Sequence, residues 1–181
     1  MTKVAALANH RNVLSLIVGL LMCVTSASGV NADERFFADL VGNWQGKGLV
    51  RDLPSSPQEN IRCRLNMSVP GQGNRLSVLG NCSVAGVVLP INGSITAQGN
   101  GYSANLFANI VQVNNSNFSG RLRGSKLALF YDGIDIYTKK RVKATLTIAK
   151  RGNKGFDIGI RRHDPNSSAS FNVGTIRFQA R

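Results

Sequence analysis

Residues 59–84 read ENIRCRLNMSVPGQGNRLSVLGNCSV, and this stretch decides the fold class. Apolar and polar residues alternate on both sides of a glycine-rich turn. The alternating positions are Ile61, Cys63, Leu65 and Met67 before the turn, and Leu76, Val78, Gly80, Cys82 and Val84 after it. A period of two is typical of antiparallel strands that have one face in the core and one face in water. The stretch therefore predicts a β-hairpin.

The two cysteines of this hairpin indicate its register. If the strands turn symmetrically about Gln72 and Gly73, opposed residues have numbers that add up to 145, as 63 and 82 do. Opposed side chains on one face are close enough for a disulfide. A shift of one residue would place the two cysteines on opposite faces of the hairpin. The spacing therefore predicts a disulfide between Cys63 and Cys82.

The same alternation recurs at residues 142–148 and 156–160, and turn residues separate the runs. The runs begin near residues 43, 59, 75, 91, 101, 116, 126, 141, 155 and 170. No helical stretch is long enough to connect parallel strands. We predict an all-β fold: a single antiparallel meander barrel of about 8–10 strands. Phe36, Phe37, Leu40 and Val41 recur at helical spacing, which predicts a short N-terminal helix that ends at Gly42.

Residues 1–32 have the features of a secretory signal peptide. Lys3 and Arg11 give a positive start, residues 13–24 form an apolar run, and small residues at Val30 and Ala32 suit the signal peptidase. We expect cleavage after Ala32, with cleavage after Ala27 as the second choice. The apolar run is shorter than the roughly 20 residues that cross a bilayer, so we expect no membrane span after cleavage. The sequence predicts a signal peptide, 1–32, and one β-barrel domain, 33–181, in a periplasmic or secreted location.

The formal net charge is +13, and Lys3 and Arg11 account for two of these positive charges. The cationic residues are spread along the chain, with one tight cluster at Lys139, Lys140, Arg141 and Lys143. Because we expect export, we do not expect nucleic acid as a partner. Weak attraction to the anionic surfaces of the cell envelope is one interpretation of the charge. A solvated basic face that keeps the protein soluble is the other.

The scarcity of reactive groups predicts that the chain is not an enzyme. His163 is the only histidine after residue 32, so a serine or cysteine nucleophile has few candidate bases. The two glutamates, Glu34 and Glu59, lie at the start of the domain and in a loop, which disfavours paired-carboxylate chemistry. With both cysteines in a disulfide, the ligands of a tetrahedral zinc site are also missing.

Residues 42–48, GNWQGKG, resemble the Gly-x-Trp opening of the calycins, which include the lipocalins and the fatty-acid-binding proteins. The resemblance implies that a short helix leads into the first strand, that Trp44 closes one end of the barrel, and that Arg177 packs on Trp44. An ordinary core tryptophan is the alternative interpretation.

The longer pattern Gly-x-Trp-x-Gly-x-Gly is similar to the start of the nitrobindin-like haem barrels. That resemblance implies ten strands and an iron ligand late in the chain, for which His163 is the candidate. The similarity ends at Leu49, and the turn residues Asp164 and Pro165 favour a surface histidine. We therefore expect no haem, no metal and no other cofactor.

The inward face of the predicted barrel contains small residues, which leave volume inside it. They are Gly80, Gly93, Ala97, Ala104, Gly120 and Ala144. We expect a small apolar molecule or lipid to bind beside the larger inward residues Trp44, Leu65, Met67, Tyr102, Phe118 and Phe156. Alternatively, the glycines relieve strain where strands coil, and bulky neighbours fill the interior.

These alternatives give two hypotheses. The first is an exported non-enzymatic barrel that binds a small apolar or amphipathic ligand. The second is a protein-binding module with a filled barrel, either an envelope-stabilising factor or a periplasmic protease inhibitor. The two cysteines and the early tryptophan also resemble small barrel inhibitors of secreted metalloproteases, which insert an N-terminal segment into the protease cleft. Here residues 33–35 are short for that task.

Overall fold

The computed structural model describes residues 32–71, 73–108, 117–134, 139, 141–152, 155–163 and 169–181. The predicted signal peptide up to residue 31, and the turn at 164–167, lie outside the described residues. The elements are α1 (Ala32–Ala38), β1 (Gly42–Val50), β2 (Glu59–Ser68), β3 (Arg75–Val84), β4 (Val87–Gln98), β5 (Gly101–Ala108), β6 (Asn117–Arg123), β7 (Lys126–Ile134), β8 (Arg141–Lys150), β9 (Phe156–His163) and β10 (Ser170–Ala180).

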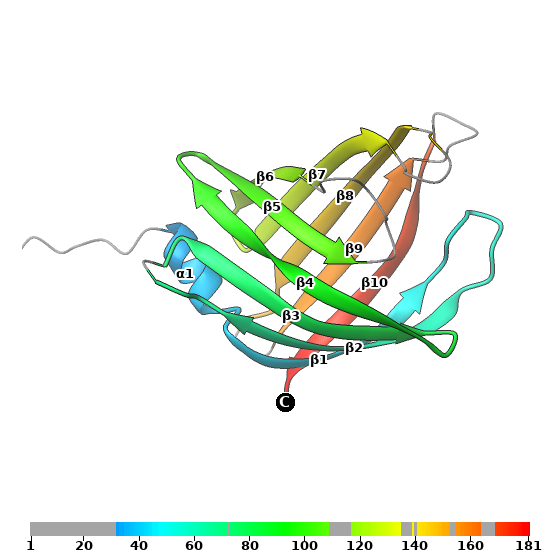
Figure 1. Cartoon of the computed structure of the whole chain (residues 1–181), viewed down its shortest axis with the longest axis horizontal. Coiled ribbons are helices and arrows are strands. Elements are labelled where there is room, and N and C mark those ends of the chain that lie inside the picture. Colours follow the sequence, from blue (N-terminus) through cyan, green and yellow to red (C-terminus); the bar gives the residue numbers. More distant parts are fainter. Residues whose placement is uncertain are drawn as a thin grey trace, which may run out of the picture.

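The ten strands form a closed antiparallel barrel (Figure 1). Each strand pairs with the next one along the chain, and β10 pairs with β1 to close the sheet. The predicted meander barrel is thus confirmed. The largest difference from the predicted strand starts is in β4, which begins at Val87 instead of near 91 because Ala85 and Gly86 form a tight turn directly after β3.

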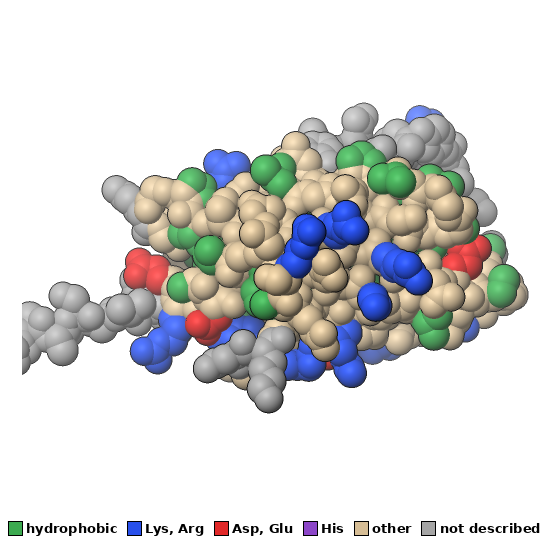
Figure 2. Space-filling view, turned by 90° about the horizontal axis from the view of Figure 1, so that it is seen from below, with side chains coloured by type: hydrophobic (Ala, Val, Ile, Leu, Met, Phe, Trp, Pro, Cys, Tyr) green, Lys and Arg blue, Asp and Glu red, His purple; other side chains and the backbone are tan. Residues whose placement is uncertain are grey.

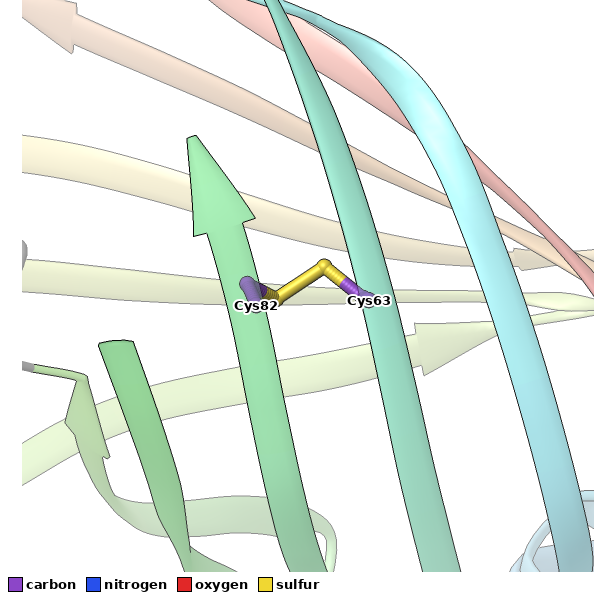
Figure 3. Close-up of a disulfide and its surroundings, with 2 residues drawn as sticks. All are labelled: Cys63 and Cys82. Atoms are coloured by element: carbon purple, nitrogen blue, oxygen red, sulfur yellow. A yellow bond between two sulfur atoms is a disulfide. The ribbon is translucent and has the colours of Figure 1, made fainter. Parts of the chain in front are cut away.

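The hairpin of β2 and β3 has the predicted register. Cys63 lies opposite Cys82, and Leu65 lies opposite Gly80. A disulfide joins the two cysteines across the strands (Figure 3). The side chains of both cysteines are buried, at 3% and 5% exposure, so the bridge lies on the inner face of the barrel.

The barrel has two different ends, which we call the capped end and the open end (Figure 1). Helix α1 lies at the capped end, beside the turn between β2 and β3. The connection between β1 and β2 and the turn between β3 and β4 lie at the open end. No helix in the described part of the chain is long and apolar enough to cross a membrane.

Helix α1 covers the capped end with Phe36, Phe37 and Leu40, which are at most 2% exposed. The helix ends at Ala38, earlier than predicted, and Leu40 lies in the turn that follows. The carbonyl of Leu40 accepts a hydrogen bond of 2.8 Å from Nε1 of Trp44 on β1. The apolar spacing that predicted a longer helix therefore comes from a helix and a turn that bury side chains on the same side.

Gly46 on β1 leaves space for the side chain of Phe178, its partner residue on β10. A Cβ atom at this position would lie 2.5 Å from the ring of Phe178, which is too close for any side chain. Phe178 takes up this space and is 1% exposed. The glycine of the GNWQGKG stretch thus makes room for a large aromatic ring in the core.

Candidate functional site

The half of the barrel nearest the capped end is filled with side chains. Five of the six predicted ligand-binding residues are in this packed core, with exposures of 7% or less: Trp44, Leu65, Met67, Tyr102 and Phe156. Aromatic rings contact each other through the middle of it. Trp44 meets Phe156 edge-on, with ring centroids 5.0 Å apart, and Phe156 stacks on Phe178 at 4.7 Å. These residues act here as a plug that closes one end of the barrel.

The prediction that Arg177 packs on Trp44 is wrong. Arg177 lies opposite Lys47, whereas Trp44 lies opposite Ala180, and an odd offset places the two side chains on opposite faces of the sheet. Arg177 points outward and is 3.6 Å from the carboxylate of Asp157. The ring of Trp44 instead has the contacts with Leu40 and Phe156 described above.

The inward glycines fit the alternative interpretation of the sequence, in which they relieve strain. A Cβ atom at Gly80 would lie 2.0 Å from the carbonyl oxygen of Arg64 on the neighbouring strand. A Cβ atom at Gly93 would lie 2.2 Å from the carbonyl oxygen of Asn105. Glycine at these positions allows close approach of adjacent backbones, so it contributes to strand coiling rather than to cavity volume.

The inner face is different toward the open end, where apolar side chains are only half-buried. Strand alternation places them inside the barrel, and they are contributed by seven strands: Val50, Val84, Ile91, Leu106, Phe118, Leu146, Ile158 and Ile160. A side chain inside a closed barrel keeps exposed surface only where the interior admits water. These inward side chains are therefore within reach of water, and Phe118 is the one predicted ligand-binding residue among them.

A second, smaller apolar cluster lies farther toward the open end. Tyr131 and Val142 are 5% and 7% exposed and pack with Phe118 and Ala144. The rings of Tyr131 and Phe118 are 5.4 Å apart. Most of the half-buried residues pack against the main core, and Phe118 also packs against this second cluster.

One charged residue, Arg162, belongs to the inner face at the open end. On β9 it continues the series Phe156, Ile158 and Ile160, and it pairs with Ala144 on the neighbouring strand. Its side chain is 19% exposed, and Nη1 is 3.3 Å from the carboxylate of Asp52 in the connection between β1 and β2. Among the described residues, Nε of Arg162 is the only buried side-chain nitrogen or oxygen without a hydrogen-bond partner.

Exposed apolar residues surround the open end. Val87 and Val88, at the tip of the hairpin of β3 and β4, are 57% and 64% exposed. Leu53 and Ile134, which also lie near this end, are 38% and 54% exposed. The turns at the open end therefore carry four exposed apolar side chains.

The outer face of β1, β2 and β10 is basic. Lys47 on β1 lies directly opposite Arg62 on one side and Arg177 on the other, so three cations form a row across three strands. Figure 2 shows lysine and arginine side chains gathered on this side of the barrel. A shallow groove of about 750 Å³ runs between β1 and β10, and Lys47, Arg177, Gln45 and Gln179 help to line it.

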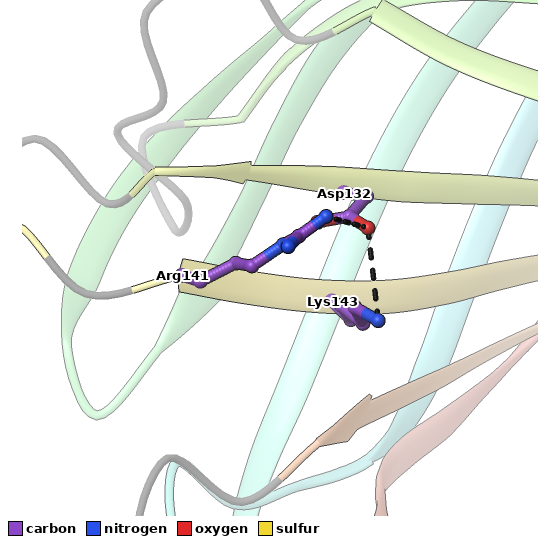
Figure 4. Close-up of polar contacts among 3 residues, drawn as sticks. All are labelled: Asp132, Arg141 and Lys143. Atoms are coloured by element: carbon purple, nitrogen blue, oxygen red, sulfur yellow. Dashed lines mark hydrogen bonds and ion pairs between the residues drawn. The ribbon is translucent and has the colours of Figure 1, made fainter.

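The basic cluster expected at residues 139–143 is partly neutralised. Arg141 makes two hydrogen bonds to Asp132, of 2.6 and 2.8 Å, and Lys143 is 3.8 Å from the same carboxylate (Figure 4). The hydrogen bond from Arg141 is the main reason that the pKa of Asp132 is lowered from its ordinary value. Lys140 lies outside the described residues.

The carboxylates and the histidine are spread over the barrel. Asp39 pairs with Lys150 at the capped end, and Asp157 pairs with Arg151 on the outer face. His163 is exposed near the end of β9, on the outer face, where it does not face the interior. No group of three or more histidine, cysteine, aspartate or glutamate residues within the described ranges is arranged to hold a metal ion.

Apart from Phe118, sequence reasoning missed the half-buried residues of the open end, and it also missed Arg162. The alternating runs contain Leu146, Ile158 and Ile160. However, alternation alone does not distinguish an inward residue that is fully packed from one that is accessible to water. Arg162 carries the clearer signal, because it places a charge where the inward series requires an apolar residue.

No family model matches this sequence, and no curated protein matches it. Among solved structures, the chain is similar to EF1p2_mFAP2b bound to DFHBI, with a TM-score of 0.48 and 10% identity, covering 83% of this chain and 100% of that chain. It is also similar to a redesigned beta barrel, mFAP1, bound to DFHBI, with a TM-score of 0.44 and 12% identity, covering 81% of this chain and 99% of that chain. Membership of the calycins stays a prediction.

Proposed function

We propose that this chain is a non-enzymatic barrel of the cell envelope, periplasmic or secreted, that binds a small apolar or amphipathic ligand inside the open half of the barrel. One observation carries the proposal: inner-face apolar side chains such as Leu146, Ile158 and Ile160 stay half-buried inside a closed sheet. An apolar space that admits water favours an apolar ligand, because the ligand removes that surface from water.

Two further features support the cellular setting. The disulfide between Cys63 and Cys82 suits an oxidising compartment. The row of Arg62, Lys47 and Arg177 supports weak attraction to anionic envelope surfaces, since its members lie side by side on the outside of the barrel. The scarcity of candidate bases and nucleophiles in the sequence supports a binding protein rather than an enzyme.

The first experiment is native mass spectrometry of the full chain, expressed with its N-terminal segment into a bacterial periplasm. We expect an intact mass that reports cleavage near Ala32, a loss of two hydrogens at Cys63 and Cys82, and an additional bound lipid-sized mass. A mass that stays free of ligand after incubation with envelope lipids would contradict the proposal.

A matched pair of variants then locates the ligand. Leu146→Trp places an indole in the interior, whereas Thr147→Trp places the same group on the outer face of β8, one residue away. Titration with the uncharged fluorescent probe N-phenyl-1-naphthylamine should show weaker binding by about tenfold or more in the first variant, which corresponds to roughly 1.4 kcal/mol. Unchanged binding in the second variant is the control. Equal binding to both variants would place the probe outside the barrel.

The second candidate function is a protein-binding module, and the exposed Val87 and Val88 favour it. An apolar hairpin tip is a common feature of a surface that contacts another protein. If no ligand binds in the barrel, replacing both valines by serine should abolish co-purification of a protein partner from the envelope fraction. Retained co-purification would contradict this second function.

A further inference from the structure

We infer that the ligand of the barrel carries an oxyanion head group, and that this head group displaces Asp52 from Arg162. The inference rests on the proposed function and names the chemical class of its ligand: an apolar chain that ends in a carboxylate or a phosphate.

The surroundings of Arg162 are apolar. The residues next to it in the barrel are Ala144 on β8 and Phe171 on β10, and the preceding inward residue of its own strand is Ile160. Burial of a cation among such groups is unfavourable unless anions and hydrogen-bond acceptors compensate for it. The position therefore needs an anion.

The anion that the chain supplies is held weakly. Asp52 is 81% exposed, and its carboxylate oxygen is 3.3 Å from Nη1 of Arg162. Hydrogen bonds between charged groups are usually shorter, at about 2.7–2.9 Å. Because Asp52 is exposed, its attraction to Arg162 is also screened by salt and opposed by the side-chain entropy of the aspartate. Another anion can therefore replace Asp52 at little cost.

Among the described residues, few partners are found for the donors of Arg162. A guanidinium group has five N–H donors in a planar fork that matches a carboxylate or a phosphate. Within the described part of the chain, one contact to Asp52 is recorded for this side chain, and its buried Nε has no partner. A head group on the inner side of Arg162 would supply the missing acceptor.

The neighbouring Arg51 provides a contrast. Its Nε donates to the carbonyl of Asn172, its Nη1 donates to the carbonyl of Pro54, and its guanidinium lies 5.9 Å from the centre of the Phe171 ring. Arg51 thus has structural partners that hold the open end together. Arg162 lies on β9, which is separated from β1 by β10. In contrast to Arg51, it has a buried Nε without a hydrogen-bond partner among the described residues.

The test compares three probes of equal chain length: dodecanoate, dodecyl phosphate and uncharged dodecanol, measured at pH 8 by calorimetric or fluorescence displacement titration. Arg162→Gln should weaken binding of both anionic probes by about tenfold or more, as expected for the loss of a charged hydrogen bond. Its effect on dodecanol should be small. The control is Arg161→Gln, on the same strand but on the outer face, where Arg161 contacts Ser170 and faces solvent.

The second variant acts in the opposite direction. Asp52→Asn removes the competing carboxylate, so binding of the anionic probes should become tighter by about two- to fivefold, in line with the small free energy of an exposed ion pair. Because the side chain of Asp52 is exposed, the substitution should leave the core of the barrel unchanged. The difference between the two anionic probes identifies the head group that the site prefers.

The outcomes separate the inference from the proposed function. If dodecanol and dodecanoate bind the wild type equally well, and neither variant changes this, the inference is overturned while ligand binding by the barrel stands. If none of the three probes binds the wild type, the proposed function fails, and the inference fails with it. Tighter anion binding by Asp52→Asn, together with weaker binding by Arg162→Gln, would support both.

Discussion

The capped end and the open end of the barrel have the same strands, the same alternation and similar apolar residues, yet more of the inward side chains are fully buried at the capped end than at the open end. At the capped end, Phe37, Leu127 and Phe156 have no exposed surface. At the open end, Leu146 and Ile158 point inward and remain half-buried. The difference is the short helix α1, which adds side chains that the strands alone do not supply. Eight strands are about the number whose own side chains fill a barrel, so ten strands need a plug.

The largest expected effect is on the free energy of unfolding. It tests whether side chains are packed more tightly at the capped end than at the open end. Leu127→Ala at the capped end should lower the free energy of unfolding by about 2–5 kcal/mol, because it leaves a cavity in a tight core. Leu146→Ala at the open end should lower it by roughly 1 kcal/mol, because part of that side chain already contacts water. Urea unfolding followed by circular dichroism measures both. Equal losses would mean that the open half is packed as tightly as the capped half.

A smaller effect is expected at the junction of helix and barrel. Trp44→Phe keeps an aromatic ring but removes the hydrogen bond to the carbonyl of Leu40. A buried carbonyl without a partner should lower the free energy of unfolding by about 1–3 kcal/mol. Relative to the wild type, the substitution should raise the rate of amide hydrogen exchange more in α1 than in β7, since the hydrogen bond anchors the helix to the barrel. Uniformly faster exchange over the whole chain would instead indicate a global loss of stability.

The smallest effect is expected at the rim of the open end, where Asp132 and Arg141 are exposed. The hydrogen bond from Arg141 lowers the pKa of Asp132 below its ordinary value of 3.8. The stabilising contribution of the pair is therefore present above that ordinary value and is lost as the pH falls through the lowered pKa. Titration of the Asp132 carboxyl carbon by NMR measures the shift directly.

Two substitutions sharpen this measurement. Arg141→Gln should return the pKa of Asp132 toward its ordinary value, whereas Lys143→Gln should have a smaller effect, because Lys143 is 3.8 Å from the carboxylate. An equal effect of the two substitutions would show that long-range charge attraction, rather than the hydrogen bonds of Figure 4, lowers the pKa.

Much of the fold was predictable because alternation and turn chemistry are local properties. The pairing of Cys63 with Cys82 fixed one register, and the register of a hairpin determines which face each residue occupies. The inward direction of the side chains was thus predicted correctly for Leu65 and Met67. The rim of exposed apolar residues at the open end could not be foreseen, because it depends on which turns lie at the same end of the barrel.

The candidate site was harder to predict, since accessibility depends on long-range packing. Tyr102 and Phe118 are both inward-facing aromatic residues, but Phe37 of α1 packs against Tyr102 at 5.8 Å and Tyr102 is buried, whereas Phe118 is only partly buried against the same core. The sequence contains no local signal that tells these two positions apart. Arg162 was also missed, although its charge interrupts an apolar series that is visible in the sequence.

The pairing of β1 with β10 joins the first and last strands of the chain, and it affects how the protein folds during synthesis. Trp44 pairs with Ala180, so the first strand to leave the ribosome must wait for the last one before the sheet can close. Until then the growing sheet has two free edges, and free edges can pair with other chains. Contacts between such distant positions also form slowly. A chaperone that shields β1 during synthesis should therefore raise the yield of folded protein more than one that acts after release.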